Sequence, residues 1–263
     1  LLDFYNQVDY DLDRLIYSSL VRFDDRGLPH GDLAETWGIS KDGTKYSFSI
    51  RKGATWHDGK PVTSQDVVFT IELLKNEAMP IPADLREFWS QIQVFAPRDD
   101  TLQFQLPEAF SPFLGYLTIG ILPKHLLEGI PPADLIASTF NLQPVGSGAF
   151  RFKNLDSKDG AITSITLEAY PGYYGEKSFI QELTFRYYPD VQTALEAYEN
   201  GDVKGLSSIP VSLIPRALRD ENLNLFTGRL PRLGMVFLNN DSKSLPFFKD
   251  IEVRRALLMA INR

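Results

Sequence analysis

The sequence predicts a mixed α/β fold. Apolar residues recur at helical spacing in some segments and alternate strictly with polar residues in others. Turn signals, chiefly Asp-Gly and proline-containing stretches, separate these segments. The predicted elements run from hairpins through a helical stretch to a strand, helix and strand series, and no repeat of fixed period is present.

The first third of the chain predicts a helix followed by a β-hairpin. Apolar residues at helical spacing indicate a helix over Leu12–Leu20. Residues 32–37 are interpreted as a short helical turn or a loop that leads into a strand. Asp42-Gly43 is typical of a tight hairpin turn, and the alternation over Tyr46–Ile50 predicts the strand that follows it.

A helix with a defined start is predicted next. Thr63 has the character of an N-cap, and Asp66 three residues later completes a variant of the capping box. The buried face of this helix is predicted to consist of Val67, Val68, Ile71 and Leu74. The remaining predictions are a helix or loop at 84–90, helices at 113–119, 131–139, 191–200 and 250–263, and strands at 92–96, 101–106, 149–155, 162–169, 182–188 and 233–239.

Composition excludes several classes of function. The net charge of −7 argues against a nucleic-acid-binding face, which is basic, and against a surface made for anionic lipid. With no cysteine in 263 residues, thiolate catalysis, cysteine zinc sites and disulfides are excluded. No run of 18 apolar residues is present, so we expect no membrane-spanning segment.

The residues that usually carry catalysis are not arranged for it. The histidines, His30, His57 and His125, lie far apart, and none has a metal-ligand partner three or four residues away. His57 follows the pattern of a turn histidine with a structural hydrogen bond. The 146–148 segment Gly-Ser-Gly leads into a predicted strand, whereas a nucleophile elbow leads into a helix. We therefore expect no catalytic residues, no metal and no cofactor.

Two tyrosine pairs leave two interpretations open. Tyr173-Tyr174 and Tyr187-Tyr188 either line a cleft or pack with a satisfied hydroxyl group.

The 250–263 helix has an apolar stripe that we expect to pack against a further part of a longer protein.

Several motifs together resemble one protein family. They are IYSSLVRF at 16–23, GDLAETW at 31–37, KDGTKYSF at 41–48, WHDGKPVTSQDVV at 56–68, PVGSGAF at 144–150, VRRA at 253–256 and AINR at 260–263. In this order they are similar to the motifs of the bacterial extracellular solute-binding proteins of family 5, the peptide and nickel class. The chain departs from the family pattern at Ser19, Ala149 and Asn262, where the family usually has Gly, Pro and Asp.

The resemblance implies a periplasmic-binding-protein-like class II lobe with an inserted α+β subdomain. Residues 1–38 and 145–240 would form the first lobe, and 39–144 the insertion. Residues 241–263 would begin the connection to a second lobe that lies outside this chain. It also implies the monomeric binding component of an ABC importer, located in the periplasm or outside the cell as a lipoprotein. Such a protein captures di- or oligopeptides or a similar small solute by hinge closure and delivers it to a membrane permease, without acting as an enzyme.

Ligand-contacting residues carry over from the resemblance only by position. They are Asn6, Gln7, Val8, Tyr17, Phe88 and Trp89. Because the resemblance places the carboxylate that holds a peptide amine in the second lobe, we expect this chain alone to bind ligand weakly or not at all. Nickel chelate, heme and oligosaccharide remain alternative ligands. A hydrolase, or a sensor or chaperone-like module on the same fold, remains an alternative function.

Overall fold

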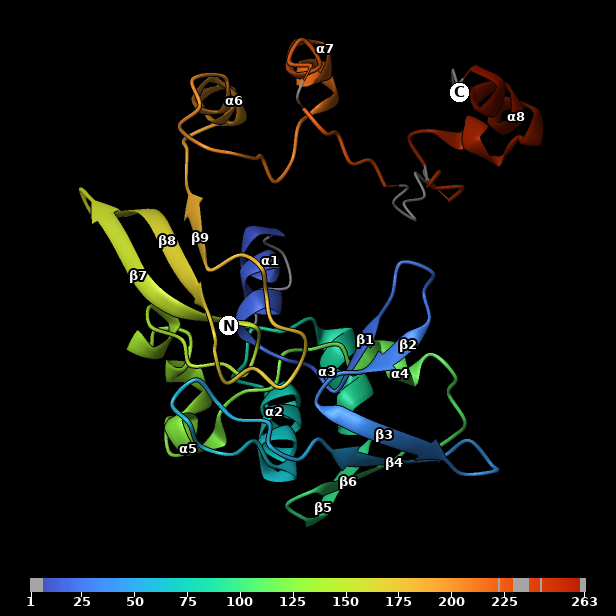
Figure 1. Ribbon diagram of the computed structural model, residues 1–263. Helices are drawn as coiled ribbons and strands as arrows, with labels where there is room; N and C mark the ends of the chain where they lie inside the picture. The colour runs from blue at the N-terminus through green and yellow to red at the C-terminus, as the bar shows by residue number, and fades with distance from the viewer. Residues whose placement is uncertain (1–6, 222, 229–236, 242, 261–263) are drawn as a thin grey trace. The chain divides into compact units, whose positions relative to one another are not determined.

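The computed structural model describes residues 7–221, 223–228, 237–241 and 243–260. Contacts divide the chain into two units, residues 1–214 and 215–263, and each is described by itself. The first unit contains every strand of the described residues, in three antiparallel sheets (Figure 1).

The largest sheet has four strands in the order β3-β4-β6-β5, which are Ala34–Ile39, Lys45–Ile50, Thr101–Gln105 and Gln93–Arg98. The predicted turn joins β3 to β4, and Gly43 has a φ of 70°, a left-handed conformation that glycine adopts at little cost. Residues 34–37 therefore form part of a strand and not a helical turn. The boundary predicted near residue 38 lies inside β3, whose partner β4 belongs to the predicted insertion.

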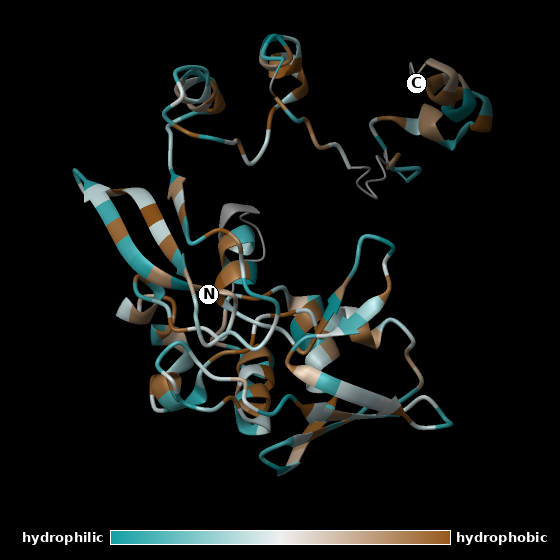
Figure 2. Ribbon diagram, in the orientation of Figure 1, coloured by the Kyte–Doolittle hydropathy of each residue, from teal (hydrophilic) through white to brown (hydrophobic). Residues whose placement is uncertain are grey.

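Two smaller sheets contain the remaining strands of this unit. β1 (Val21–Phe23) pairs with β2 (Pro29–Gly31), and β7 (Phe150–Lys158), β8 (Ala161–Ala169) and β9 (Glu182–Arg186) form a three-stranded sheet. Apolar and polar residues alternate along β7 and β8, as the banding in Figure 2 shows. This alternation lets one face of the sheet pack on α1 (Gln7–Ile16), which contacts β7.

The predicted capping box is confirmed in α2 (Ser64–Lys75). The Thr63 amide donates to the Asp66 carboxylate at 2.8 Å, and Asp66 also accepts from the Lys124 amide at 3.0 Å. Asp66 thus caps α2 and ties it to α5 (Lys124–Leu127). Val67, Ile71 and Leu74 of the predicted apolar face are buried, and Val68 is partly buried.

We expect Thr63→Ala to lower the free energy of unfolding by about 1 kcal/mol, because the N-cap side chain is lost. Urea denaturation followed by tryptophan fluorescence reports this unit, since all three tryptophans lie within it. Glu72→Ala on the exposed side of the same helix is the matched control, with a change below about 0.5 kcal/mol. Equal effects of the two substitutions would argue against the cap.

The remaining helices of this unit are α3 (Ala83–Ser90), α4 (Phe113–Tyr116) and α6 (Val191–Glu199), with short 3-10 turns at 132–134, 139–141 and 211–213. The helix predicted over 131–139 is wrong, and only two 3-10 turns lie there. The Asn141 side-chain nitrogen donates to the carbonyls of Leu135 and Ile136 at 2.8 Å, in place of the backbone amides that would bond to them in a continuous helix. The helix predicted at 113–119 is shorter than expected and ends at Tyr116.

One hydrophobic core joins residues of the predicted first lobe and the predicted insertion. It contains Leu12, Leu33 and Leu167 together with Phe48 and Trp89. In the second unit, α8 (Ile251–Ala260) confirms the predicted terminal helix, and the Asp250 carboxylate accepts from the Glu252 amide at 2.8 Å. α7 (Ile214–Ala217) spans the division between the units, and a 3-10 turn, Pro246–Lys249, precedes α8. The strand predicted at 233–239 lies largely outside the described residues.

Candidate functional site

Three segments that are distant in sequence meet at the C-terminal end of α1. We call this place the crossing, and it comprises residues 16–18, His57 and residues 146–148. The Gly148 amide donates to the Ile16 carbonyl at 2.8 Å, and the Ser18 hydroxyl donates to the Ser147 carbonyl at 3.0 Å. These bonds satisfy a carbonyl at the end of α1, which explains why the helix ends at Ile16 and not at the predicted Leu20.

Glycines allow the backbones to approach this closely. A Cβ at position 146 would lie 1.9 Å from the Ile16 carbonyl oxygen, and one at position 148 would lie 2.4 Å from the Leu15 carbonyl oxygen. Both distances are far below van der Waals contact, and both contacts are with backbone atoms. The 144–150 motif therefore marks a backbone contact that excludes every side chain.

The His57 side chain forms hydrogen bonds with the backbone on both sides of Ser147. Its Nδ1 accepts from the Gly146 amide at 3.1 Å, so its Nε2 carries the proton and donates to the Gly148 carbonyl at 3.1 Å. Burial lowers the pKa of His57 to about 4, which keeps the ring neutral. Both ring nitrogens are engaged with backbone groups, so His57 has a structural role, as the sequence predicted.

A second polar node lies next to the crossing. Asp32 accepts from the Ser19 amide at 2.9 Å and from the Tyr174 hydroxyl group, and the Arg51 guanidinium lies over the Tyr174 ring at 5.4 Å. Burial, and then the Asp32 charge, raise the pKa of Tyr174. This tyrosine is packed with a satisfied hydroxyl group, which is one of the two interpretations that the sequence left open.

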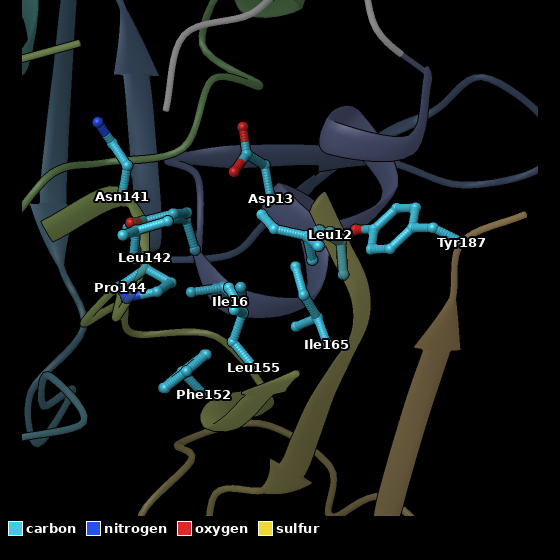
Figure 3. Close-up of a pocket in the computed structure, with 12 residues that line it drawn as sticks. Leu12, Asp13, Ile16, Asn141, Leu142, Pro144, Phe152, Leu155, Ile165 and Tyr187 are labelled. Carbon is cyan, nitrogen blue, oxygen red and sulfur yellow. The ribbon is translucent and has the colours of Figure 1, made fainter. Parts of the chain in front are cut away.

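A pocket of about 440 Å³ opens beside the crossing, between α1 and the β7–β8 hairpin (Figure 3). Its lining residues are Leu12, Asp13, Ile16, Tyr17, Asn141, Leu142, Pro144, Phe152, Leu155, Ile162, Ile165 and Tyr187. The volume falls in the range of pockets that hold small molecules. In the described part of the chain, no group of three His, Asp or Glu residues is placed to hold a metal ion.

Comparison with known proteins identifies the fold and this motif set. Residues 29–263 match the family described as bacterial extracellular solute-binding proteins, family 5 Middle. The chain belongs to this family.

Relatives in the family carry peptide-binding names. The oligopeptide-binding protein AppA of Bacillus subtilis is 30% identical over 96% of this chain and 46% of its own length. The dipeptide-binding protein of Escherichia coli is 29% identical over 88% of this chain and 45% of its own length. The chain thus spans about half the length of the curated relatives it matches.

The fold of this chain is similar to solved structures of periplasmic-binding-protein-like proteins. Campylobacter jejuni NikZ in complex with Ni(L-His) superposes with a TM-score of 0.73 at 30% identity, over 95% of this chain and 48% of that one. Bacillus subtilis AppA in complex with a nonapeptide superposes with a TM-score of 0.72 at 28% identity, over 82% and 42%. The mixed α/β class and the binding-protein fold are therefore confirmed. Among the described residues, no helix has the length and apolarity that a membrane span requires.

The structure places the predicted family ligand residues in three different surroundings. Asn6 lies outside the described residues, and Gln7 and Val8 form the first turn of α1. Tyr17 is buried and lines the pocket. Of the predicted ligand residues that the structure describes, Tyr17 is the one that lines this pocket.

Phe88 and Trp89 do not line the pocket beside the crossing. Trp89 has no exposed surface and packs between Phe104 and Phe113, so in this conformation it offers nothing for a ligand to contact. Phe88 is partly buried and stacks on Tyr116 with ring centroids 4.0 Å apart. Of the pair, only Phe88 has surface with which the predicted contact can be made.

Sequence reasoning did not select Asp13, Asn141 or Ile165, which also line the pocket. Asp13 follows Leu12 in the predicted helix, and Ile165 lies in a correctly predicted strand. Pairing the apolar face of that helix with the alternating face of β7–β8 is the signal that points to Asp13 and Ile165, whereas Asn141 lies in a 3-10 turn outside both elements.

Proposed function

We propose that this chain is part of the solute-binding component of an ABC importer, and that the solute is a di- or oligopeptide. The observation that carries the proposal is the family match over residues 29–263, together with relatives whose names specify dipeptide and oligopeptide binding. In this proposal the protein closes about a hinge on its solute and delivers it to a membrane permease. It works as a monomer.

The solute leaves the protein chemically unchanged in this proposal. The relatives are named as binding proteins, and the one histidine at the crossing has both ring nitrogens bonded to backbone groups. The family is described as extracellular, and we propose that the protein works outside the cytoplasmic membrane as an anchored lipoprotein.

A nickel chelate is a second candidate solute, favoured by the similarity to NikZ in complex with Ni(L-His). His30 and His125 are paired with Asp24 and Asp58 at 3.0 and 2.7 Å, and His57 belongs to the crossing. Direct capture of a bare ion by these residues would break structural contacts. A metal would therefore arrive with its ligands already attached.

The decisive experiment uses the protein as its gene encodes it in the native host. Isothermal titration calorimetry with a dipeptide, a nonapeptide and Ni(L-His) should give saturable heat with at least one peptide and none with the nickel complex. Heat with Ni(L-His) alone would replace the first candidate by the second. Mass spectrometry of the peptide after prolonged incubation should return it intact, and cleavage would overturn the proposal of a binding protein.

A further inference from the structure

The pocket between α1 and the β7–β8 hairpin has an apolar part and a polar part. Leu12 and Ile16 from α1 and Phe152, Leu155 and Ile165 from the hairpin supply the apolar wall. In Figure 3 the carboxylate of Asp13 and the amide of Asn141 lie on one side, and Phe152 and Leu155 lie on the other. A ligand that fits this pocket has one apolar end and one polar end.

Two polar side chains of the wall, Asn141 and Asp13, present hydrogen-bond acceptors. Asn141 uses its side-chain nitrogen to donate to the carbonyls of Leu135 and Ile136, both at 2.8 Å. These two bonds fix the orientation of the amide and leave its Oδ1 buried, with no partner in the described part of the chain. Asp13 adds a carboxylate, which also only accepts when ionised.

Tyr17 supplies a second unpartnered oxygen in the same wall. Its side chain is 5% exposed, and its hydroxyl group has no partner among the described residues. Burial, and then the nearby Asp13 charge, raise the pKa of Tyr17, so its hydroxyl group stays protonated. A buried polar atom left without a partner costs about 1–3 kcal/mol, so a ligand that donates hydrogen bonds here removes a cost already present.

An ammonium group matches this wall better than any other polar head. It carries three donors and no acceptor, and it is attracted by the Asp13 carboxylate. A carboxylate head would face the like charge of Asp13 and the acceptor Oδ1 of Asn141, and only the Tyr17 hydroxyl group could donate to it. A hydroxyl head would supply one donor and no charge.

We propose that this pocket binds a primary ammonium compound carrying one aromatic or branched aliphatic group. The volume of about 440 Å³ suits a molecule of this size. The apolar group rests on the hairpin wall, and the ammonium group contacts Asp13 and draws in the side chains of Tyr17 and Asn141. This inference does not rest on the proposed transport function, because it is argued only from the residues that line this pocket.

The test uses the 263-residue chain with 2-phenylethylamine as the probe, followed by ligand-observed NMR and calorimetry. Saturable binding is expected for the amine. Binding at least about tenfold weaker is expected for the isosteric 2-phenylethanol, and none for phenylacetate. The dipeptide Phe-Gly is a second arm, which distinguishes a peptide amine from a free amine as the source of the ammonium group. Absence of saturation with both amines, or equal binding of phenylacetate, would overturn the proposal.

Two matched pairs of variants locate the site. Asp13→Asn should weaken amine binding by about tenfold. Asp11→Asn, two residues away on the same helix and outside the lining, should change it by less than about twofold. Ile165→Trp should fill the pocket and abolish binding, and Ile39→Trp, on an exposed position of β3, should leave it unchanged. Equal effects within the first pair would contradict the assignment even if the tryptophan variants fail to fold.

Discussion

Replacing Gly146 with alanine should destabilise residues 1–214 by more than about 3 kcal/mol or prevent their folding. The added methyl group would lie 1.9 Å from the Ile16 carbonyl oxygen, and this carbonyl already accepts from Gly148 at 2.8 Å. Relief would require α1 and the 146–148 segment to separate. Separation would break the backbone bonds of the crossing and leave buried polar groups without partners. Urea denaturation followed by tryptophan fluorescence measures the loss.

Gly38→Ala is the matched control for this substitution. A Cβ at position 38 has no atom within 4 Å, and Gly38 lies in β3, where alanine is tolerated. We expect its free energy of unfolding to stay within about 1 kcal/mol of the parent value. If Gly146→Ala were as stable as Gly38→Ala, the close approach at the crossing would be wrong.

The sequence predicted the contacts between residues that are close in the chain and did not predict the contacts between distant ones. The Thr63 and Asp66 cap joins residues three apart, and the Gly43 turn joins neighbouring strands, so local rules were sufficient for both. The crossing joins residues 89 and 129 positions apart. The sequence placed the glycines at 146 and 148 just before a strand, but no local pattern identified α1 as the segment that they approach.

The aromatic pair in α3 shows a second limit. Consecutive residues of a helix point about 100° apart, so Phe88 and Trp89 can be buried to different extents although both contact Tyr116. The hydrophobic core buries Trp89 completely and leaves Phe88 partly exposed against Tyr116. A resemblance by position could select the pair, but only packing against Phe104 and Phe113 distinguishes its members.

The free energy of unfolding of residues 1–214 should fall between pH 6.5 and about 4 because of His57. Its pKa is lowered from 6.5 to about 4 in the folded chain, chiefly by burial. The unfolded chain therefore binds a proton at His57 more readily than the folded chain does between these values. The contribution of neutral His57 is complete above pH 6.5 and is lost as the pH falls toward 4. The loss amounts to about 3 kcal/mol at most, since each pKa unit is worth about 1.4 kcal/mol.

Protonation also destroys one contact of the crossing. A proton on Nδ1 would face the Gly146 amide, which donates to that nitrogen at 3.1 Å in the neutral form. Two donors would then oppose each other in a buried place. The expected sequence on acidification is loss of the hydrogen bond between His57 and Gly146, followed by separation of the 146–148 segment from α1.

His57→Asn isolates this effect from other titrations. The variant should be less stable at pH 7, but its stability should change little between pH 6.5 and 4, because asparagine does not titrate. His30→Asn, at an exposed position paired with Asp24, should keep the acid slope of the parent. Carboxylates with a lowered pKa, such as Asp24 and Asp58, lose their contributions below about pH 4 and so lie outside this window. An unchanged acid slope in His57→Asn, or an NMR titration of the His57 ring near pH 6.5, would show that the ring is not held neutral by the crossing.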